Sequence, residues 1–183
     1  MYLLDTSALI TPFHEGRLRA LGIALGYRST DEIQRRLIGW FTKHFQLGTL
    51  VLCDSVRREV VEKPKRPEAQ MIRSLENAIR ILQPTGRSVQ ILTEITKFVY
   101  DHYLVQDVGP FLRGADPEVV SIAKAYGATV ITEEHHVLPE HDGGNDRIKG
   151  KPKLPYIAFV FQVRCVSLMT LLNELPGIKD ADG

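Results

Sequence analysis

Short apolar runs alternate with longer amphipathic segments along the chain. Residues 2–4, 49–53, 128–132 and 163–166 are continuous apolar or β-branched runs, which predict short buried strands. Helical patterns separate these runs. Short buried strands that alternate with helices are typical of an α/β fold with a parallel sheet.

Between the strands, apolar residues recur every three or four positions, which predicts helices. The expected helices cover residues 8–11, 30–47, 56–62, 68–82, 88–103, 117–126 and 168–175, with a short helix or turn at 156–161. Residues 13–28 carry scattered glycines and predict mostly loop, and residues 139–155 predict a long surface loop.

Residues at the helix ends support several of these assignments. Ser29 and Glu32 have the spacing of a capping box. Asp116 is expected at an N-cap, with Pro117 in the first helical position. Gly127 is expected to end the same helix in a left-handed conformation.

Length and composition indicate one domain. The chain has 183 residues, of which 44% are hydrophobic, enough for a sizeable core. We expect a single domain over residues 1–175 and a flexible tail over 176–183. The formal net charge is +1, which excludes strongly basic binders and acidic disordered tails. Nucleic acid would have to be bound by local charge.

Cys53 and Cys165 lie far apart in apolar runs, which favours two buried free thiols over a disulfide or a zinc site. Asp5 interrupts the region where a signal peptide needs an apolar run. No stretch approaches the roughly 20 apolar residues of a membrane span. We therefore expect a soluble, cytoplasmic protein.

Several carboxylates follow or precede the predicted strands. Asp5 comes directly after the first strand, Glu133 and Glu134 follow the strand at 128–132, and Asp116 begins the helix before that strand. Because ligands of parallel sheets bind beyond the carboxyl ends of the strands, we expect these acids to meet at one edge.

Each acid also has a simpler interpretation. Asp116 can be a helix cap, Glu59 a surface charge, and Glu133 and Glu134 loop residues. Asp5 differs because a carboxylate beside the core needs donors or a cation. Converging carboxylates require a counter-charge, and Mg²⁺ and Mn²⁺ prefer oxygen ligands. Such a site activates water and stabilises charge on phosphate oxygens.

Four segments together resemble the PIN-domain ribonucleases, whose best-known members are the VapC-type toxins. The opening M-Y-L-L-D-T-S-A-L-I resembles the family's apolar strand followed by Asp-Thr-Ser. Glu59 lies centrally in a helix after an apolar strand, and Asp116 lies in G-A-D-P-E-V-V, followed by A-T-V-I-T-E-E. The last strand and helix, over 163–175, also fit. The resemblance covers about a third of the chain: residues 1–12, 49–62, 114–134 and 163–175.

The resemblance implies a set of site residues. Catalytic and metal-binding roles would fall to Asp5, Glu59, Asp116 and Glu134, with Glu133 as a rival for the fourth position. Thr6, Ser7 and Thr132 would support these ligands, with Thr6 or Ser7 orienting Asp5 or a bound water while also capping the first helix.

The resemblance further implies a PIN-like three-layer α/β/α fold with a central parallel sheet of four to five short strands. Helical insertions at about 29–47 and 68–105 make the chain longer than a minimal member, and it looks like a longer, little-characterised bacterial branch. In that branch we expect an acidic residue after Lys-x-Pro, where this chain has Tyr156.

Two basic groups are candidates for holding an RNA backbone. The first surrounds the Glu59 helix and consists of Arg57, Arg58, Lys63, Lys65 and Arg66. The second is the strip Lys149, Lys151 and Lys153. In both cases a solvated loop is the simpler interpretation. His135, His136 and His141 lie near acids, but no zinc motif includes them, so a solvated loop is again favoured.

The sequence-based hypothesis is a metal-dependent endoribonuclease that uses Mg²⁺ or Mn²⁺. By resemblance it would be the toxin of a toxin–antitoxin pair, inhibited by a small antitoxin, and a homodimer. One alternative is a catalytically weak PIN-like domain that binds RNA or protein. Another is a haloacid-dehalogenase-type phosphatase, whose D-x-D pattern requires Asp where this chain has Ser7.

Overall fold

A five-stranded parallel sheet forms the centre of the molecule. The computed structural model describes residues 1–62, 66–75, 77–135 and 147–178. The strands run in the order β3-β2-β1-β4-β5 and all pair in parallel. Their bounds are β1 Tyr2–Leu4, β2 Leu50–Cys53, β3 Ile81–Leu82, β4 Thr129–Ile131 and β5 Cys165–Val166. The expected parallel α/β sheet of four to five short strands is confirmed.

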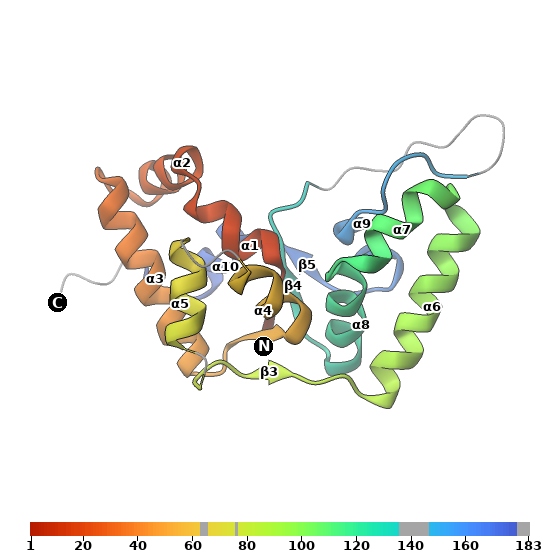
Figure 1. Cartoon of the computed structure of the whole chain (residues 1–183). Helices are drawn as coiled ribbons and strands as arrows, with labels where there is room; N and C mark the ends of the chain where they lie inside the picture. Colours follow the sequence, from red (N-terminus) through yellow and green to blue (C-terminus); the bar gives the residue numbers. More distant parts are fainter. Residues whose placement is uncertain (63–65, 76, 136–146, 179–183) are drawn as a thin grey trace.

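Helices cover both faces of this sheet, so the three-layer α/β/α arrangement is also confirmed. Figure 1 shows α2, α3, α5 and α10 on one side of the strands and α6, α7, α8 and α9 on the other. The helices are α1 Thr6–Ile10, α2 Glu15–Leu25, α3 Thr30–Gln46, α4 Asp54–Val61, α5 Pro67–Ser74, α6 Gly86–His102, α7 Val105–Arg113, α8 Asp116–Tyr126, α9 Leu154–Val160 and α10 Leu168–Glu174. A short 3₁₀ helix, η1, covers Thr11–Phe13.

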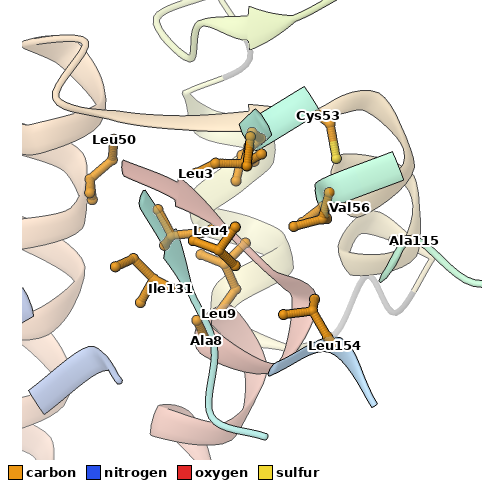
Figure 2. Packing of buried hydrophobic residues seen from close by; sticks show 14 of the residues in the cluster. Leu3, Leu4, Ala8, Leu9, Leu50, Cys53, Val56, Ala115, Ile131 and Leu154 are labelled. Carbon is orange, nitrogen blue, oxygen red and sulfur yellow. The ribbon is translucent and has the colours of Figure 1, made fainter. Parts of the chain in front are cut away.

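The core lies around β1. Leu3 and Leu4 are fully buried, as is every residue of β2. Figure 2 shows Leu4, Leu9 and Ile131, which come from β1, α1 and β4, close together in the core. Burial of each such side chain contributes about 1.5–3 kcal/mol. This packing fixes the strand ends and the helices that follow them.

Several local predictions are confirmed. At the start of α3 the Ser29 side chain accepts a hydrogen bond from the Glu32 amide, which is the Ser29 half of the expected capping box. Gly127 follows α8 with φ of +65°, the left-handed conformation expected of a glycine at this position. The structure also shows that Ser167 caps α10, where its side chain accepts from the Thr170 amide.

Two stretches were wrongly predicted from their local pattern. Residues 13–28 contain α2 rather than mostly loop, and Leu18, Gly22 and Leu25 are its buried residues. Residues 68–82 do not form one helix, because α5 ends at Ser74 and Ile81–Leu82 pairs with β2 as the edge strand β3. In both cases packing against neighbouring elements outweighs the local preference of the sequence, which is for loop at residues 13–28 and for helix at residues 75–82.

Two helix caps also differ from expectation. Asp5, not Thr6 or Ser7, is the N-cap of α1, and it accepts from the Ser7 amide. Ala115, not Asp116, is the N-cap residue of α8, so Asp116 is the first helical residue. The carboxylate of Asp116 is thereby not used as a cap. The sequence pattern also predicted no helix over Val105–Arg113, where the structure has α7.

Two described parts of the C-terminal region differ from expectation. The last part of the predicted 139–155 loop belongs to α9, which begins at Leu154; residues 136–146 lie outside the described residues. The expected tail begins with packed residues, because Ile178 is buried and its carbonyl accepts from the Tyr27 hydroxyl at 2.6 Å. Within the described ranges, no helix combines the length and apolar character needed to cross a bilayer.

Candidate active site

The four predicted carboxylates come from four different elements. Asp5 follows β1, Glu59 lies in α4, Asp116 begins α8, and Glu134 lies in the segment after β4. The Asp5 amide donates to the Ile131 carbonyl at 2.9 Å, so the ends of β1 and β4 are in register. The sheet edge therefore positions Asp5 beside the segment that carries Glu134.

Asp5 is buried, with 3% of its surface exposed, and two hydroxyls hold its carboxylate. Ser7 Oγ and Thr132 Oγ1 both donate to Asp5 Oδ2, at 2.6 and 2.9 Å. Burial raises the pKa of Asp5 above its ordinary value, the two hydroxyls oppose this rise, and the charge of Glu134 adds to it.

The same two hydroxyls organise the segment after β4. Ser7 Oγ accepts from the Glu133 amide at 2.9 Å, and Thr132 Oγ1 accepts from the Glu134 amide at 3.1 Å. The two hydroxyl oxygens lie 3.0 Å apart. Asp5 and the backbone of Glu133 and Glu134 are therefore joined through the hydroxyls of Ser7 and Thr132.

Glu59 is held by donors from two other elements. The Thr6 hydroxyl donates to Glu59 Oε2 at 2.6 Å, and the Ala115 amide donates to Oε1 at 3.0 Å. Glu59 thus connects α1, α4 and the start of α8. The Thr6 hydroxyl bonds Glu59 rather than Asp5, so only Ser7 of the expected pair holds Asp5 through its side chain.

The pKa of Asp116 depends on the charges of the other three acids. Burial is the main cause that raises its pKa to about 7, and the negative charges of Asp5 and Glu134 add to the rise, as does that of Glu59. Lys151 acts in the opposite direction, with its Nζ 3.9 Å from Asp116 Oδ2. Asp116 therefore lies within electrostatic reach of the three other predicted carboxylates.

The two neighbouring glutamates after β4 have different partners. Glu134 Oε2 accepts from the Leu154 amide at 3.2 Å at the start of α9, and its charge acts on Asp5 and Asp116. Glu133 Oε1 instead accepts from the Leu168 amide at 2.9 Å at the start of α10. Of the two, Glu134 is thus the one coupled to the other acids.

In the part of the chain that the structure describes, no three or more His, Cys, Asp or Glu side chains form a group that could hold a metal ion as placed. As placed, Glu59 and Glu134 each accept a hydrogen bond from a protein donor. The donor set nevertheless consists of carboxylate oxygens, which suit Mg²⁺ and Mn²⁺.

The described members of the first basic group form ion pairs with acids other than the four predicted site residues. Arg57 and Arg58 form ion pairs with Asp54 in their own helix, and Arg66 pairs with Glu68. Lys63 and Lys65 lie outside the described residues, as do His136 and His141; His135 is described and exposed. The RNA-binding role of this group stays a prediction.

A pocket of about 330 Å³ opens beyond the ends of β4 and β5. It is lined by Arg17, Thr132, Glu133, Glu134, His135, Cys165, Val166 and Ser167. Sequence reasoning missed Arg17, because it assigned residues 13–28 to a loop.

Both cysteines are free; Cys53 is buried and Cys165 half-buried. Burial, with the charges of Asp5 and Glu134, raises the pKa of Cys165 to about 12.

The chain was compared with known proteins. Residues 24–176 match a family described as "Domain of unknown function (DUF4411)", a range that contains Glu59, Asp116 and Glu134 but not Asp5. No curated protein matches the sequence significantly. A solved structure titled "Crystal Structure of FitAcB from Neisseria gonorrhoeae" is similar over 90% of this chain and 96% of the other chain, with 15% identity and a TM-score of 0.42.

Proposed function

The chain belongs to the DUF4411 family, and we propose that it is a metal-dependent endoribonuclease. The proposed site consists of Asp5, Glu59, Asp116 and Glu134, and the proposed cation is Mg²⁺ or Mn²⁺. The observation that carries the proposal is the placement of these acids at one sheet edge, where Ser7 and Thr132 hold Asp5, and Thr6 and the Ala115 amide hold Glu59.

Four mutually repelling carboxylates at one sheet edge are costly without a counter-charge. The acids come from distant parts of the sequence, yet separate hydrogen bonds hold Asp5 and Glu59 at this edge. A purely structural role would not require four acids to gather where ligands of parallel sheets bind. A site that binds a hard divalent cation accounts for all four.

The site residues have two proposed roles: four would bind the cation, and the others keep those ligands in place. Asp5, Asp116, Glu59 and Glu134 would bind the cation through carboxylate oxygens. Ser7 and Thr132 keep the Asp5 carboxylate in place, and Thr6 does the same for Glu59. A bound divalent cation supplies an activated water and stabilises negative charge on a phosphate oxygen.

The test is cleavage of single-stranded RNA with Mn²⁺ or Mg²⁺ by wild type, Asp5→Asn and Asp116→Asn. Asparagine keeps the shape and removes the charge. We expect activity to fall by more than about 100-fold, since loss of groups around a metal's ligands already costs about 10–100-fold. Glu118→Gln, two residues along α8 from Asp116, is the matched control and should retain activity. Equal activity in both asparagine variants would exclude the assigned site.

The alternative is a PIN-like domain that binds RNA or protein without cleaving it. The observation that favours it is the absence, within the described residues, of a preformed group that could hold a metal. Tyr156 also stands where an acid is expected from the family resemblance. RNA binding without cleavage, together with no uptake of Mn²⁺ at millimolar concentration by calorimetry, would support this alternative.

We also propose a toxin role, with a small antitoxin as partner and a homodimeric assembly. This rests on the sequence resemblance to VapC-type toxins. Growth arrest on expression would support the toxin role if co-expression of the protein encoded by the adjacent gene relieves it. Sedimentation at micromolar concentration would test the dimer.

A further inference from the structure

A short segment crosses from the α6–α7 junction to the start of α9, and we name residues 147–154 the strap. Its first part is attached by backbone hydrogen bonds. The Ile148 amide donates to the His102 carbonyl at 2.7 Å, and the Leu104 amide donates to the Ile148 carbonyl at 3.3 Å. The Gly150 amide donates to Asp107 Oδ2 at 3.0 Å.

The other end of the strap is attached to the acidic site and to the core. The Leu154 amide donates to Glu134 Oε2 at 3.2 Å. The Leu154 side chain is fully buried, and Figure 2 shows it among the core residues near Ala8 and Leu9. Pro152 is buried as well. Both ends of the strap are therefore fixed relative to the four carboxylates.

Lys151 lies between these two attachments. Its Nζ is 3.9 Å from Asp116 Oδ2, and 44% of its side chain is exposed. Its backbone lies within the strap, which is attached at both ends, whereas its ammonium group is at the end of a flexible four-carbon side chain. Lys151 can therefore reach both the carboxylate and a ligand in solvent.

The negative charge of the site is the reason why a cation at the position of Lys151 matters for an anionic substrate. A phosphodiester is an anion, and the edge it must approach carries four acids. Among the described residues, Lys151 is the cation that an ion pair joins to one of these four carboxylates. The arginines Arg57 and Arg58 are paired with Asp54 instead.

We infer that Lys151 is a substrate-positioning residue, which exchanges its Asp116 partner for a phosphate oxygen of the RNA strand. This inference rests on the proposed function, because it takes RNA as the ligand of the same site. An ammonium group pairs with phosphate as a point charge, so the exchange requires only rotation of the lysine stem.

The experiment separates a phosphate contact from a counter-ion role by working in the Asp116→Asn variant. This substitution removes the carboxylate partner of Lys151 and, by the proposed function, stops cleavage. Binding of a fluorescent single-stranded RNA is measured by anisotropy between 50 and 300 mM salt, in EDTA. We expect added Lys151→Gln to weaken binding about tenfold at low salt. The slope of log K against log salt should fall by about 0.7, the value for one phosphate contact.

Lys153→Gln in the same background is the matched control. Lys153 is exposed on the same strap, two residues from Lys151, and its replacement changes the net charge equally. We expect it to leave the salt slope unchanged. Lys151→Arg should restore most of the affinity, because it keeps the charge. Thermal denaturation of each variant confirms that folding is retained.

Three outcomes would overturn the inference: no effect of Lys151→Gln in the Asp116→Asn background, an equal effect of Lys153→Gln, or no RNA binding at all. The first would leave Lys151 as a counter-ion to Asp116. Failure of the proposed function has a different signature, namely wild type that cleaves no RNA with Mn²⁺ while the Lys151-dependent salt slope persists. In active wild type, Lys151→Gln should raise KM for RNA more than it lowers kcat.

Discussion

Ser7 joins two parts of the site through one hydroxyl. Its Oγ donates to Asp5 and accepts from the Glu133 amide, 126 residues away along the chain. Removal of this hydroxyl leaves a buried carboxylate with fewer donors and a backbone amide without its acceptor. The stability of the sheet edge therefore depends on Ser7 irrespective of any activity.

We predict that Ser7→Ala lowers the free energy of unfolding by about 1–3 kcal/mol, since hydrogen bonds to charged groups are worth about that much. Urea denaturation measures the change. Thr93→Ala is the control, because this exposed hydroxyl bonds only to the Val89 carbonyl in its own helix. Its effect should stay within about 0.5 kcal/mol. Equal effects of the two substitutions would contradict the role given to Ser7.

A second buried polar residue lies far from the acids. His44 in α3 is 5% exposed and contacts Trp40 in a tilted arrangement, with ring centroids 4.5 Å apart. Its Nε2 lies 3.3 Å from the Pro176 carbonyl. Burial lowers the pKa of His44 below its ordinary 6.5, the contact with the Pro176 carbonyl opposes this, and the charge of Lys43 adds to it.

This shift predicts a pH dependence of stability. Below about pH 6.5 the unfolded chain binds the proton more readily than the folded one, so the free energy of unfolding falls as pH decreases through the folded pKa of His44. The slope contributed is at most about 1.4 kcal/mol per pH unit. His44→Gln should reduce this slope in urea titrations between pH 5 and 7.5. Exposed His14→Gln is the control, and an unchanged slope in His44→Gln would refute the prediction.

At the scale of elements, a glycine inside α3 and a glycine at the end of α8 differ in backbone conformation. Gly127 ends α8 with φ of +65°, whereas Gly39 lies inside α3 with no positive φ. A Cβ added at either position meets no atom within 4 Å. Only conformation distinguishes the two sites.

We therefore predict opposite effects of alanine. Gly127→Ala should lower the free energy of unfolding by about 1–2 kcal/mol, since a side chain is disfavoured in the left-handed region. Gly39→Ala should raise it by about 0.5–1 kcal/mol through helix propensity. Chemical denaturation measures both values. Stabilisation by both substitutions would mean that the backbone at Gly127 does not require glycine, and destabilisation by both would contradict the prediction for Gly39.

At the scale of the whole molecule, the acidic edge connects four elements. Asp5, Glu59, Asp116 and Glu134 join β1, α4, α8 and the segment after β4. A ligand that binds all of them should stabilise the folded chain as a unit, because the unfolded chain cannot assemble the same site.

We predict that Mg²⁺ or Mn²⁺ raises the free energy of unfolding of wild type by about 2.7 kcal/mol at 100 times its Kd. Asp5→Asn and Asp116→Asn should lose most of this increment, whereas Glu118→Gln should keep it. Thermal denaturation in EDTA and in metal provides the comparison. A similar increment in wild type and in both asparagine variants would point to cation binding elsewhere.

How far the sequence predicts the fold depends on the range of the interactions. Short buried strands such as β1 and capped helices such as α3 follow from adjacent residues. By contrast, α2 was missed because its glycines weaken helical propensity while α3 and η1 pack against it. Ile81–Leu82 was assigned to a helix because its pairing with β2 lies outside any local pattern.

The sequence by itself determined the alternation of strands and helices, and it placed Asp5 and Glu134 after strands that end at one edge. These features follow from the periodicity and hydrogen bonding of near neighbours. The tertiary structure decided which partners meet: Thr6 with Glu59, Glu133 with α10, and Lys151 with Asp116. Such contacts join residues far apart in the chain, so they depend on how the elements pack against the sheet.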